Sequence, residues 1–96
     1  MTEFDIIREG GGSKGRYLIR QGSEEAELTW SVTTPTLVIA DHTHVPDSLR
    51  GTGAGLALVT RLVADARAEG FRIMPLCPFV NAQRKKHPEW ADAFSV

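Results

Sequence analysis

A run of glycines in the middle of the chain has the composition of a phosphate-binding loop. The run is Arg50-Gly51-Thr52-Gly53-Ala54-Gly55. Glycine lets the backbone approach a ligand closely, and the unpaired N–H groups of a following helix, with the helix dipole, offer about half a positive charge to an anion. A phosphate group therefore fits such a loop. A tight turn at a closely packed helix start is the alternative interpretation.

Two common phosphate-loop patterns do not fit this run. A Walker A loop requires Lys and then Ser or Thr directly after its last glycine, whereas Gly55 is followed by Leu56 and Ala57. The dinucleotide pattern G-x-G-x-x-G, counted from Gly51, puts its third small residue at Leu56, which is too large for close packing of a helix on a strand. The pattern that remains is R-x-x-G-x-G, carried by Arg50, Gly53 and Gly55.

Cys77 is the second candidate for chemistry. It is the only cysteine, so neither an internal disulfide nor a zinc site built on several thiols can form. A thiol attacks as its thiolate, which a helix N-terminus and cationic neighbours favour, and Cys77 lies between a predicted strand and a predicted short helix. The hypothesis is a covalent nucleophile. The alternatives are a residue that lines a pocket and a small buried hydrophobe.

His42 and His44 are the third candidate. They are two residues apart on a predicted strand, so their side chains point to the same face. Either could accept a proton from Cys77 or from a substrate, and either could instead make a structural hydrogen bond. A metal site made of these two histidines and Cys77 is a weaker hypothesis, because no carboxylate is suitably spaced. We expect no metal.

The elements that must position these residues begin with strands. Between Glu25 and Thr33, apolar residues alternate with polar ones, which is typical of a sheet with one buried face. The run Thr36-Leu37-Val38-Ile39-Ala40 is apolar on both faces, which predicts a central strand covered on each side. Shorter strands are expected around Phe4 and Ile6 and over 16–20, with a flexible glycine-rich hairpin loop over 10–15 and a turn over 21–23.

After residue 48 the apolar period changes to that of a helix. The apolar stripe of an amphipathic helix consists of Leu56, Val59, Leu62, Val63 and Ala66. Gly70 is expected to cap this helix in the left-handed conformation, and a strand follows over 71–74. A short helix is predicted from a cap at Asn81 to about Lys86, where His87-Pro88 must end it.

The order of these elements predicts the α+β class. The last strand should run parallel to the central strand through a right-handed crossover. A chain of 96 residues has room for a single domain, expected over residues 1–96. Its 42% hydrophobic and 24% charged residues argue against disorder and against a membrane protein, and its net charge of −1 gives no general affinity for nucleic acid. The acidic N-terminus is unlike a secretory signal, so we expect a cytoplasmic protein.

The strand-loop-helix context of R-x-x-G-x-G resembles the pyrophosphate-binding loop of the GNAT superfamily of acetyl-coenzyme A-dependent N-acetyltransferases. Further motifs resemble the small YjdJ-type GNAT-like family over nearly the whole chain. These motifs are His42-Thr43-x-Val45-Pro46, Arg50-Gly51-x-Gly53, Cys77-Pro78-Phe79-Val80 and His87-Pro88-Glu89-Trp90. Members of that family lack the N-terminal helices with which larger GNAT enzymes build the site for the acceptor substrate. The first 45 residues of this chain likewise show no helical period.

This resemblance implies a GNAT-like mixed sheet with one main helix, a short C-terminal helix and an acetyl-coenzyme A site. Backbone N–H groups of Gly51, Thr52, Gly53, Ala54 and Gly55 would hold the pyrophosphate, with Arg50 adding charge. The pantetheine arm would lie between the strands over 36–45 and 71–76, which brings the thioester near Cys77. Arg84, Lys85 or Lys86 could reach the adenosine 3′-phosphate, although a solvated helix face explains these three equally well.

The function that follows from the resemblance is transfer of acetyl from acetyl-coenzyme A to a primary amine, either directly or through Cys77. A small amine, a polyamine, a peptide N-terminus and a lysine side chain are all candidate acceptors. A homodimer could complete the acceptor cleft. The alternative is a non-catalytic acyl-coenzyme A sensor or interaction module, because little of the chain is left to enclose a substrate. A domain for another nucleotide is a third candidate.

Overall fold

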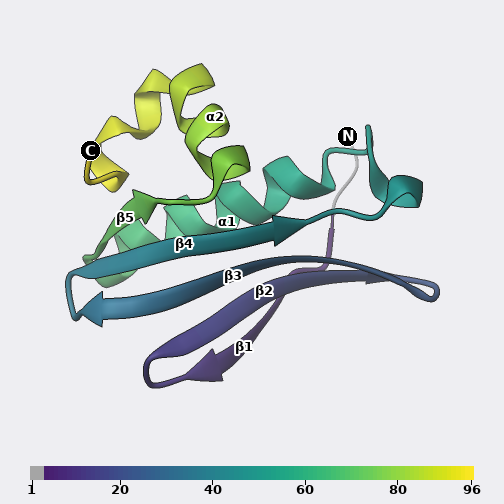
Figure 1. The fold of residues 1–96 in the computed structure, drawn as a ribbon, viewed down its shortest axis with the longest axis horizontal. Coiled ribbons are helices and arrows are strands. Elements are labelled where there is room, and N and C mark those ends of the chain that lie inside the picture. The colour runs from purple at the N-terminus through teal and green to yellow at the C-terminus, as the bar shows by residue number, and fades with distance from the viewer. Residues whose placement is uncertain (1–3) are drawn as a thin grey trace.

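A mixed sheet with the strand order β1-β2-β3-β4-β5 forms the frame of the computed structural model, which describes residues 4–96 (Figure 1). The first four strands are antiparallel and β5 runs parallel to β4. The predicted α+β class and the predicted order of elements along the chain are therefore confirmed. The elements are β1 (Ile7–Gly11), β2 (Lys14–Gln21), β3 (Glu24–Thr34), β4 (Leu37–His44), η1 (Asp47–Leu49), α1 (Ala54–Glu69), β5 (Arg72–Pro75), α2 (Pro78–Lys86) and η2 (Pro88–Ala93).

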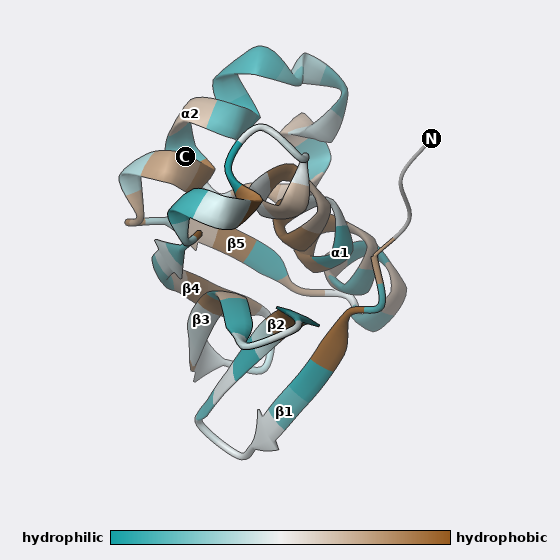
Figure 2. Cartoon of the chain, turned by 90° about the vertical axis from the view of Figure 1, so that its right-hand side faces the viewer, coloured by the Kyte–Doolittle hydropathy of each residue, from teal (hydrophilic) through white to brown (hydrophobic). Residues whose placement is uncertain are grey.

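The core lies between one face of the sheet and the apolar stripe of α1. In β3 the residues Ala26, Leu28 and Trp30 are buried, as their alternation predicts. Figure 2 shows α1 along this inner face and α2 beyond β5. Helices therefore cover one face, and Leu37 and Ile39 of β4 are only half-buried. The expectation that β4 is covered on both sides is wrong for the outer face.

The glycine-rich segment over 10–15 is not the flexible loop that was expected. Strands β1 and β2 stay paired as far as Gly11 and Lys14, so the connection is a two-residue turn. Gly10 has a φ of +100°, and a Cβ there would lie 2.6 Å from Cα of Gly15. The glycines thus permit close strand pairing instead of preventing it. The first strand begins at Ile7, and residues 1–3 of the acidic N-terminal segment lie outside the described residues.

A one-residue register shift in the β3–β4 pair decides which side chains of β4 face the core. Trp30 pairs with Ala40, but the preceding residue Thr29 pairs with His42, so Asp41 is an extra residue in β4. Such a bulge reverses the alternation of side chains along the strand. Beyond it, Thr43 pairs with the buried Leu28 and faces inward.

Strands β4 and β5 separate where the bulge begins. Their pairing ends at Ala40 and Pro75, whereas β4 continues to His44. The N–H of Cys77 donates to the carbonyl of Ala40 at 3.0 Å, and the chain then enters α2. Beyond Ala40, the edge of β4 that faces α2 is consequently not paired with β5.

The end of α1 lies where the sequence predicted it, whereas α2 begins earlier than predicted. Gly70 caps α1 with a φ of 78° and its N–H donates to the carbonyl of Ala66, as expected. Helix α2 begins earlier than predicted, with Cys77 as its N-cap, and Asn81 lies inside it. Pro78 explains the difference because its fixed φ suits the first helical position. None of the helices in residues 4–96 is both long and apolar enough to cross a bilayer.

Candidate functional site

The glycine loop presents several unpaired N–H groups at the start of α1. Within the described chain, the N–H groups of Gly51, Gly53 and Gly55 have no acceptor, whereas those of Thr52 and Ala54 donate to the Leu49 carbonyl and to Oγ1 of Thr52, each at 3.3 Å. Gly51 and Gly53 have φ values of 78° and 89°, which favour glycine. Three of the five N–H groups predicted to hold a phosphate are thus available for an anion.

A cavity of about 440 Å³ lies directly against this loop. Thr43 and Val45 at the end of β4 form its second wall, and Phe79 of α2 forms its third. The cavity thus occupies the place where β4 and the chain after β5 diverge. It joins a polar loop suited to an anion to the apolar side chains of Val45 and Phe79.

Gly55 shows that the loop is also closely packed. A Cβ on Gly55 would lie 2.7 Å from Cζ of Phe79 and 3.3 Å from Cγ2 of Val45. Ordinary carbon contacts start near 3.5 Å, so a side chain does not fit at this position without a shift of Phe79. The tight-turn interpretation therefore describes Gly55 correctly, and the same close approach brings the loop N–H groups to the cavity wall.

Arg50 lies at the rim of this cavity. Its side chain is 72% exposed and its Nε lies 3.3 Å from Oδ1 of Asp47. The same Nε is 3.4 Å from the carbonyl of Val45. An exposed ion pair of this kind contributes little stability, so the guanidinium can turn toward an anion at small cost.

Cys77 lies immediately behind the cavity wall. It is 3% exposed, and its Sγ is 3.2 Å from Oγ1 of Thr43, which lines the cavity. The sequence places Cys77 before a short helix, and the structure makes it the N-cap of α2. The thiol therefore combines a hydrogen-bonding hydroxyl with the positive end of a helix dipole.

The structure does not bring His42 and His44 to Cys77. Both side chains are exposed on the outer face of the sheet, where they pair across the strands with Thr29 and Glu27. The bulge at Asp41 is the reason, because it turns Thr43 inward in their place. The prediction that the two histidines share a face holds. Among residues 4–96, no three His, Cys, Asp or Glu side chains converge as a metal site.

A comparison with protein families matches residues 16–93 to the model described as GCN5-related N-acetyl-transferase. The chain belongs to this GCN5-related family. A solution structure of a GCN5-like protein from Staphylococcus aureus is similar, with 27% sequence identity and a TM-score of 0.73. The similarity covers 99% of this chain and 91% of that one. No curated protein matches. The family and the fold expected from the sequence motifs are thereby confirmed.

The three basic residues of α2 in this GCN5-related chain lie away from the glycine loop. Arg84, Lys85 and Lys86 form the last turn of α2, at the opposite end of that helix from Cys77. Nε of Arg84 donates to Oδ1 of Asn81 at 2.8 Å. Arg84 and Lys85 line a separate depression beside Pro88. They are not part of the cavity that the loop borders.

Two residues of the site were not singled out from the sequence as candidates for it. Thr43 belongs to the His42-Thr43-x-Val45-Pro46 motif, but the motif by itself predicts no role for its side chain. Phe79 follows Cys77-Pro78, and nothing in the sequence distinguishes it from an ordinary residue at the start of a helix. Its role becomes visible only in the structure, where its ring fills the space beside Gly55.

Proposed function

We propose that this GCN5-related chain is an acetyl-coenzyme A-dependent N-acetyltransferase that acetylates a primary amine. The observation that carries the proposal is the cavity between the glycine loop, Thr43 and Phe79, which joins unpaired N–H donors to apolar walls. Coenzyme A matches both parts of this cavity, because its charged pyrophosphate suits the N–H donors and its long, largely uncharged arm suits the apolar walls. Bound there, acetyl-coenzyme A would supply an activated acyl group.

The residues that would hold the co-substrate follow from this match. The N–H groups of Gly51, Gly53 and Gly55 would bind the pyrophosphate, and Arg50 would add a positive charge at the rim. Beyond Ala40 the edge of β4 is not paired with β5, so its backbone groups are available to the amides of the arm. Arg84 or Lys85 would meet the 3′-phosphate only outside this cavity.

Two chemical routes are open to the acyl group. In the first, Sγ of Cys77 attacks the thioester, a new thioester forms on Cys77 and the thiol of coenzyme A leaves; an amine then takes the acetyl group and frees Sγ. Thr43 would orient the thiol in this route, since its hydroxyl contacts Sγ. In the second, the amine attacks the thioester directly, the thiol of coenzyme A leaves and the amine proton goes to water; His42 and His44, on the outer face of the sheet, could receive it only through intervening water.

A second candidate function, non-catalytic binding of acyl-coenzyme A, is supported by the absence of an element in the described chain that would enclose an acceptor substrate. Strands β1 and β2 are joined by a two-residue turn, and no helix of the described chain covers the outer face of the sheet. A chain with this open face could act as an acyl-coenzyme A-binding module instead of an enzyme. A second copy of the chain could equally provide the missing wall of an acceptor cleft.

The proposal is tested by titration calorimetry with acetyl-coenzyme A and by intact mass spectrometry after incubation with it. We expect saturable binding and, for the covalent route, a gain of one acetyl group that Cys77→Ala abolishes. Release of free coenzyme A in the presence of an amine panel reports transfer by either route. Binding without such release would favour the module, and absence of both binding and labelling would overturn the acetyl-coenzyme A assignment.

The histidines need a separate measurement, because they lie on the other face of the sheet. His42→Gln and His44→Gln should bind acetyl-coenzyme A like the original chain, since neither lines the cavity. A loss of turnover in either variant while acetyl-coenzyme A binding is unchanged would support a role as proton acceptor. Unchanged turnover in both variants leaves water as the acceptor.

A further inference from the structure

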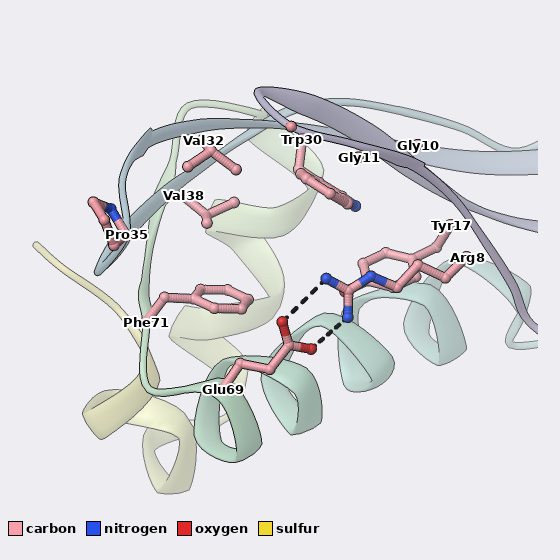
Figure 3. Close-up of a pocket in the computed structure, with 11 residues that line it drawn as sticks. Arg8, Gly10, Gly11, Tyr17, Trp30, Val32, Pro35, Val38, Glu69 and Phe71 are labelled. Atoms are coloured by element: carbon pink, nitrogen blue, oxygen red, sulfur yellow. Dashed lines mark hydrogen bonds and ion pairs between the residues drawn. The ribbon is translucent and has the colours of Figure 1, made fainter.

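A second cavity lies at the opposite end of β4 and α1 from the glycine loop (Figure 3). Its volume is about 210 Å³. Val32, Val38 and Phe71 form an apolar end, and Figure 3 shows Arg8 and Glu69 at the other end beside Trp30 and Tyr17. A cavity with both apolar and polar walls is the usual form of a small-molecule site.

Trp30 supplies the observation that points to a ligand. Its side chain is 6% exposed, and its Nε1 is the buried side-chain nitrogen or oxygen in residues 4–96 that has no hydrogen-bond partner. Buried donors are almost always paired, so an orphaned one calls for a missing acceptor. In Figure 3 the indole nitrogen lies on the side of the ring that faces Arg8 and Tyr17.

Arg8 provides a second donor at the same end. Its guanidinium carbon lies 5.5 Å from the ring centroid of Trp30. Its two terminal nitrogens are occupied, since Nη1 contacts Asp65 and Glu69 and Nη2 donates to Oε1 of Glu69 at 3.1 Å. No hydrogen bond of its Nε–H is found within the described residues. Because almost none of the Nε1 surface is accessible, an acceptor that enters between Trp30 and Arg8 must move the 34% exposed Arg8 side chain slightly, and it then meets two N–H groups.

The charges around this end balance. Arg8 and Arg61 are positive, and both contact Asp65, while Glu69 is the second carboxylate. Two positive and two negative charges leave no excess with which to attract an ion. The acceptor is therefore a neutral carbonyl and not a carboxylate. The Glu69 carboxylate, with lone pairs to spare, can accept from an N–H of the same ligand.

We propose that this cavity binds a small neutral aromatic carboxamide. The aromatic ring lies against Val32, Val38 and Phe71, the carbonyl oxygen accepts from Nε1 of Trp30 and Nε of Arg8, and the amide nitrogen donates to Glu69. The size is suitable, because an apolar cavity of about 150 Å³ is enough for benzene. The site is independent of acyl transfer, since it shares no residue with the cavity at the glycine loop.

The test is a titration of the ¹⁵N-labelled full chain with benzamide, followed by ¹H–¹⁵N correlation spectra. The chain has two tryptophans, and Trp90→Phe identifies the indole N–H signal of Trp30. We expect saturable shifts of that signal and of the Gly11 amide, with the Trp90 indole and the Gly53 amide unmoved. Benzoate and benzene are the comparison ligands, and both should bind more weakly than benzamide.

Two variants separate the polar from the apolar part of the site. Trp30→Phe removes the donor, so the affinity read from the Gly11 amide should fall roughly two- to tenfold, the effect of one neutral hydrogen bond. Val32→Phe fills the apolar end and should abolish binding; where it does not fold, Trp30→Phe decides. No saturable shift of the Trp30 indole with benzamide overturns the site, and equal binding of benzoate or benzene overturns the carboxamide class.

Discussion

Replacement of Gly55 by alanine tests the geometry of the glycine loop most directly. The new Cβ would lie 2.7 Å and 3.1 Å from Cζ and Cε2 of Phe79 and 3.3 Å from Cγ2 of Val45. Since carbon contacts are comfortable from about 3.5 Å, the Phe79 ring must retreat by about 0.8 Å. The contacted atoms are the far end of a side chain, so the ring can move, and it moves within the wall of the cavity.

Two opposing effects set the change in the free energy of unfolding of Gly55→Ala, and a third sets the change in its affinity for acetyl-coenzyme A. Overpacking costs about 1–3 kcal/mol, and alanine in place of glycine in a helix returns about 1 kcal/mol. The free energy of unfolding should therefore fall by about 0–2 kcal/mol, or up to about 15 °C in Tm. Alanine keeps the N–H at this position, but its Cβ and the displaced Phe79 ring take up cavity space beside that N–H and hold the phosphate away from it. Loss of one hydrogen bond to a charged phosphate is worth about 1.5–3 kcal/mol, so acetyl-coenzyme A should bind roughly 10- to 150-fold more weakly.

The assay is titration calorimetry with acetyl-coenzyme A, run beside urea unfolding so that binding and stability are measured separately. Gly11→Ala is the matched control, because a Cβ at Gly11 meets nothing within 4 Å and the residue lies outside the glycine-loop cavity. In the double variant with Phe79→Leu we expect recovered stability and still weak binding. Folded Gly55→Ala protein that binds acetyl-coenzyme A within about twofold of the original chain would refute the reasoning.

Two further predictions concern the fold. Gly15→Ala puts a Cβ 2.3 Å from Cζ2 of Trp30 and 2.7 Å from the carbonyl oxygen of Glu9. Urea unfolding should therefore show that the free energy of unfolding falls by about 3 kcal/mol or more, against less than about 0.5 kcal/mol for Gly11→Ala. Equal stability of the two variants would contradict the packing of Trp30 on Gly15. Burial, together with the 2.7 Å hydrogen bond that the Tyr17 hydroxyl donates to Asp65, raises the pKa of Tyr17 above its ordinary value of 10.0. The protonated phenol therefore contributes its full stabilisation of the fold below pH 10.0, and this contribution declines as the pH rises further. Tyr17 is the single tyrosine, so phenolate absorbance follows it alone, and a midpoint at 10.0 in the folded chain would show the raised pKa to be wrong.

The sequence predicted the elements whose pattern is local. Alternation identified β3, the apolar stripe identified α1, and Gly70 marked the end of that helix. These features depend on neighbouring residues only, and the energetics of a half-buried strand or an amphipathic helix are visible in the periodicity itself. The glycine loop was found in the same way, from residue types and spacing between a strand and a helix.

The errors arose where a residue acts through a distant partner. The glycines over 10–15 suggested flexibility, yet Gly15 is required because the Trp30 ring occupies the place of its side chain. Asn81 is a good capping residue, but Pro78 started α2 earlier. In each case the local preference was real, and a contact or constraint elsewhere was stronger.

What the sequence alone determined is the family, the order of elements and the loop that could bind an anion. What only the tertiary structure decided is which side chain reaches Cys77. The segment Asp41-His42-Thr43-His44 is polar throughout, so its pattern fits either face of the sheet equally well. Pairing with Trp30 and Leu28 of β3, whose inward positions are set by burial, requires one extra residue at Asp41. That single residue turns Thr43 inward to Cys77 and both histidines outward, because alternation along a strand leaves no other arrangement.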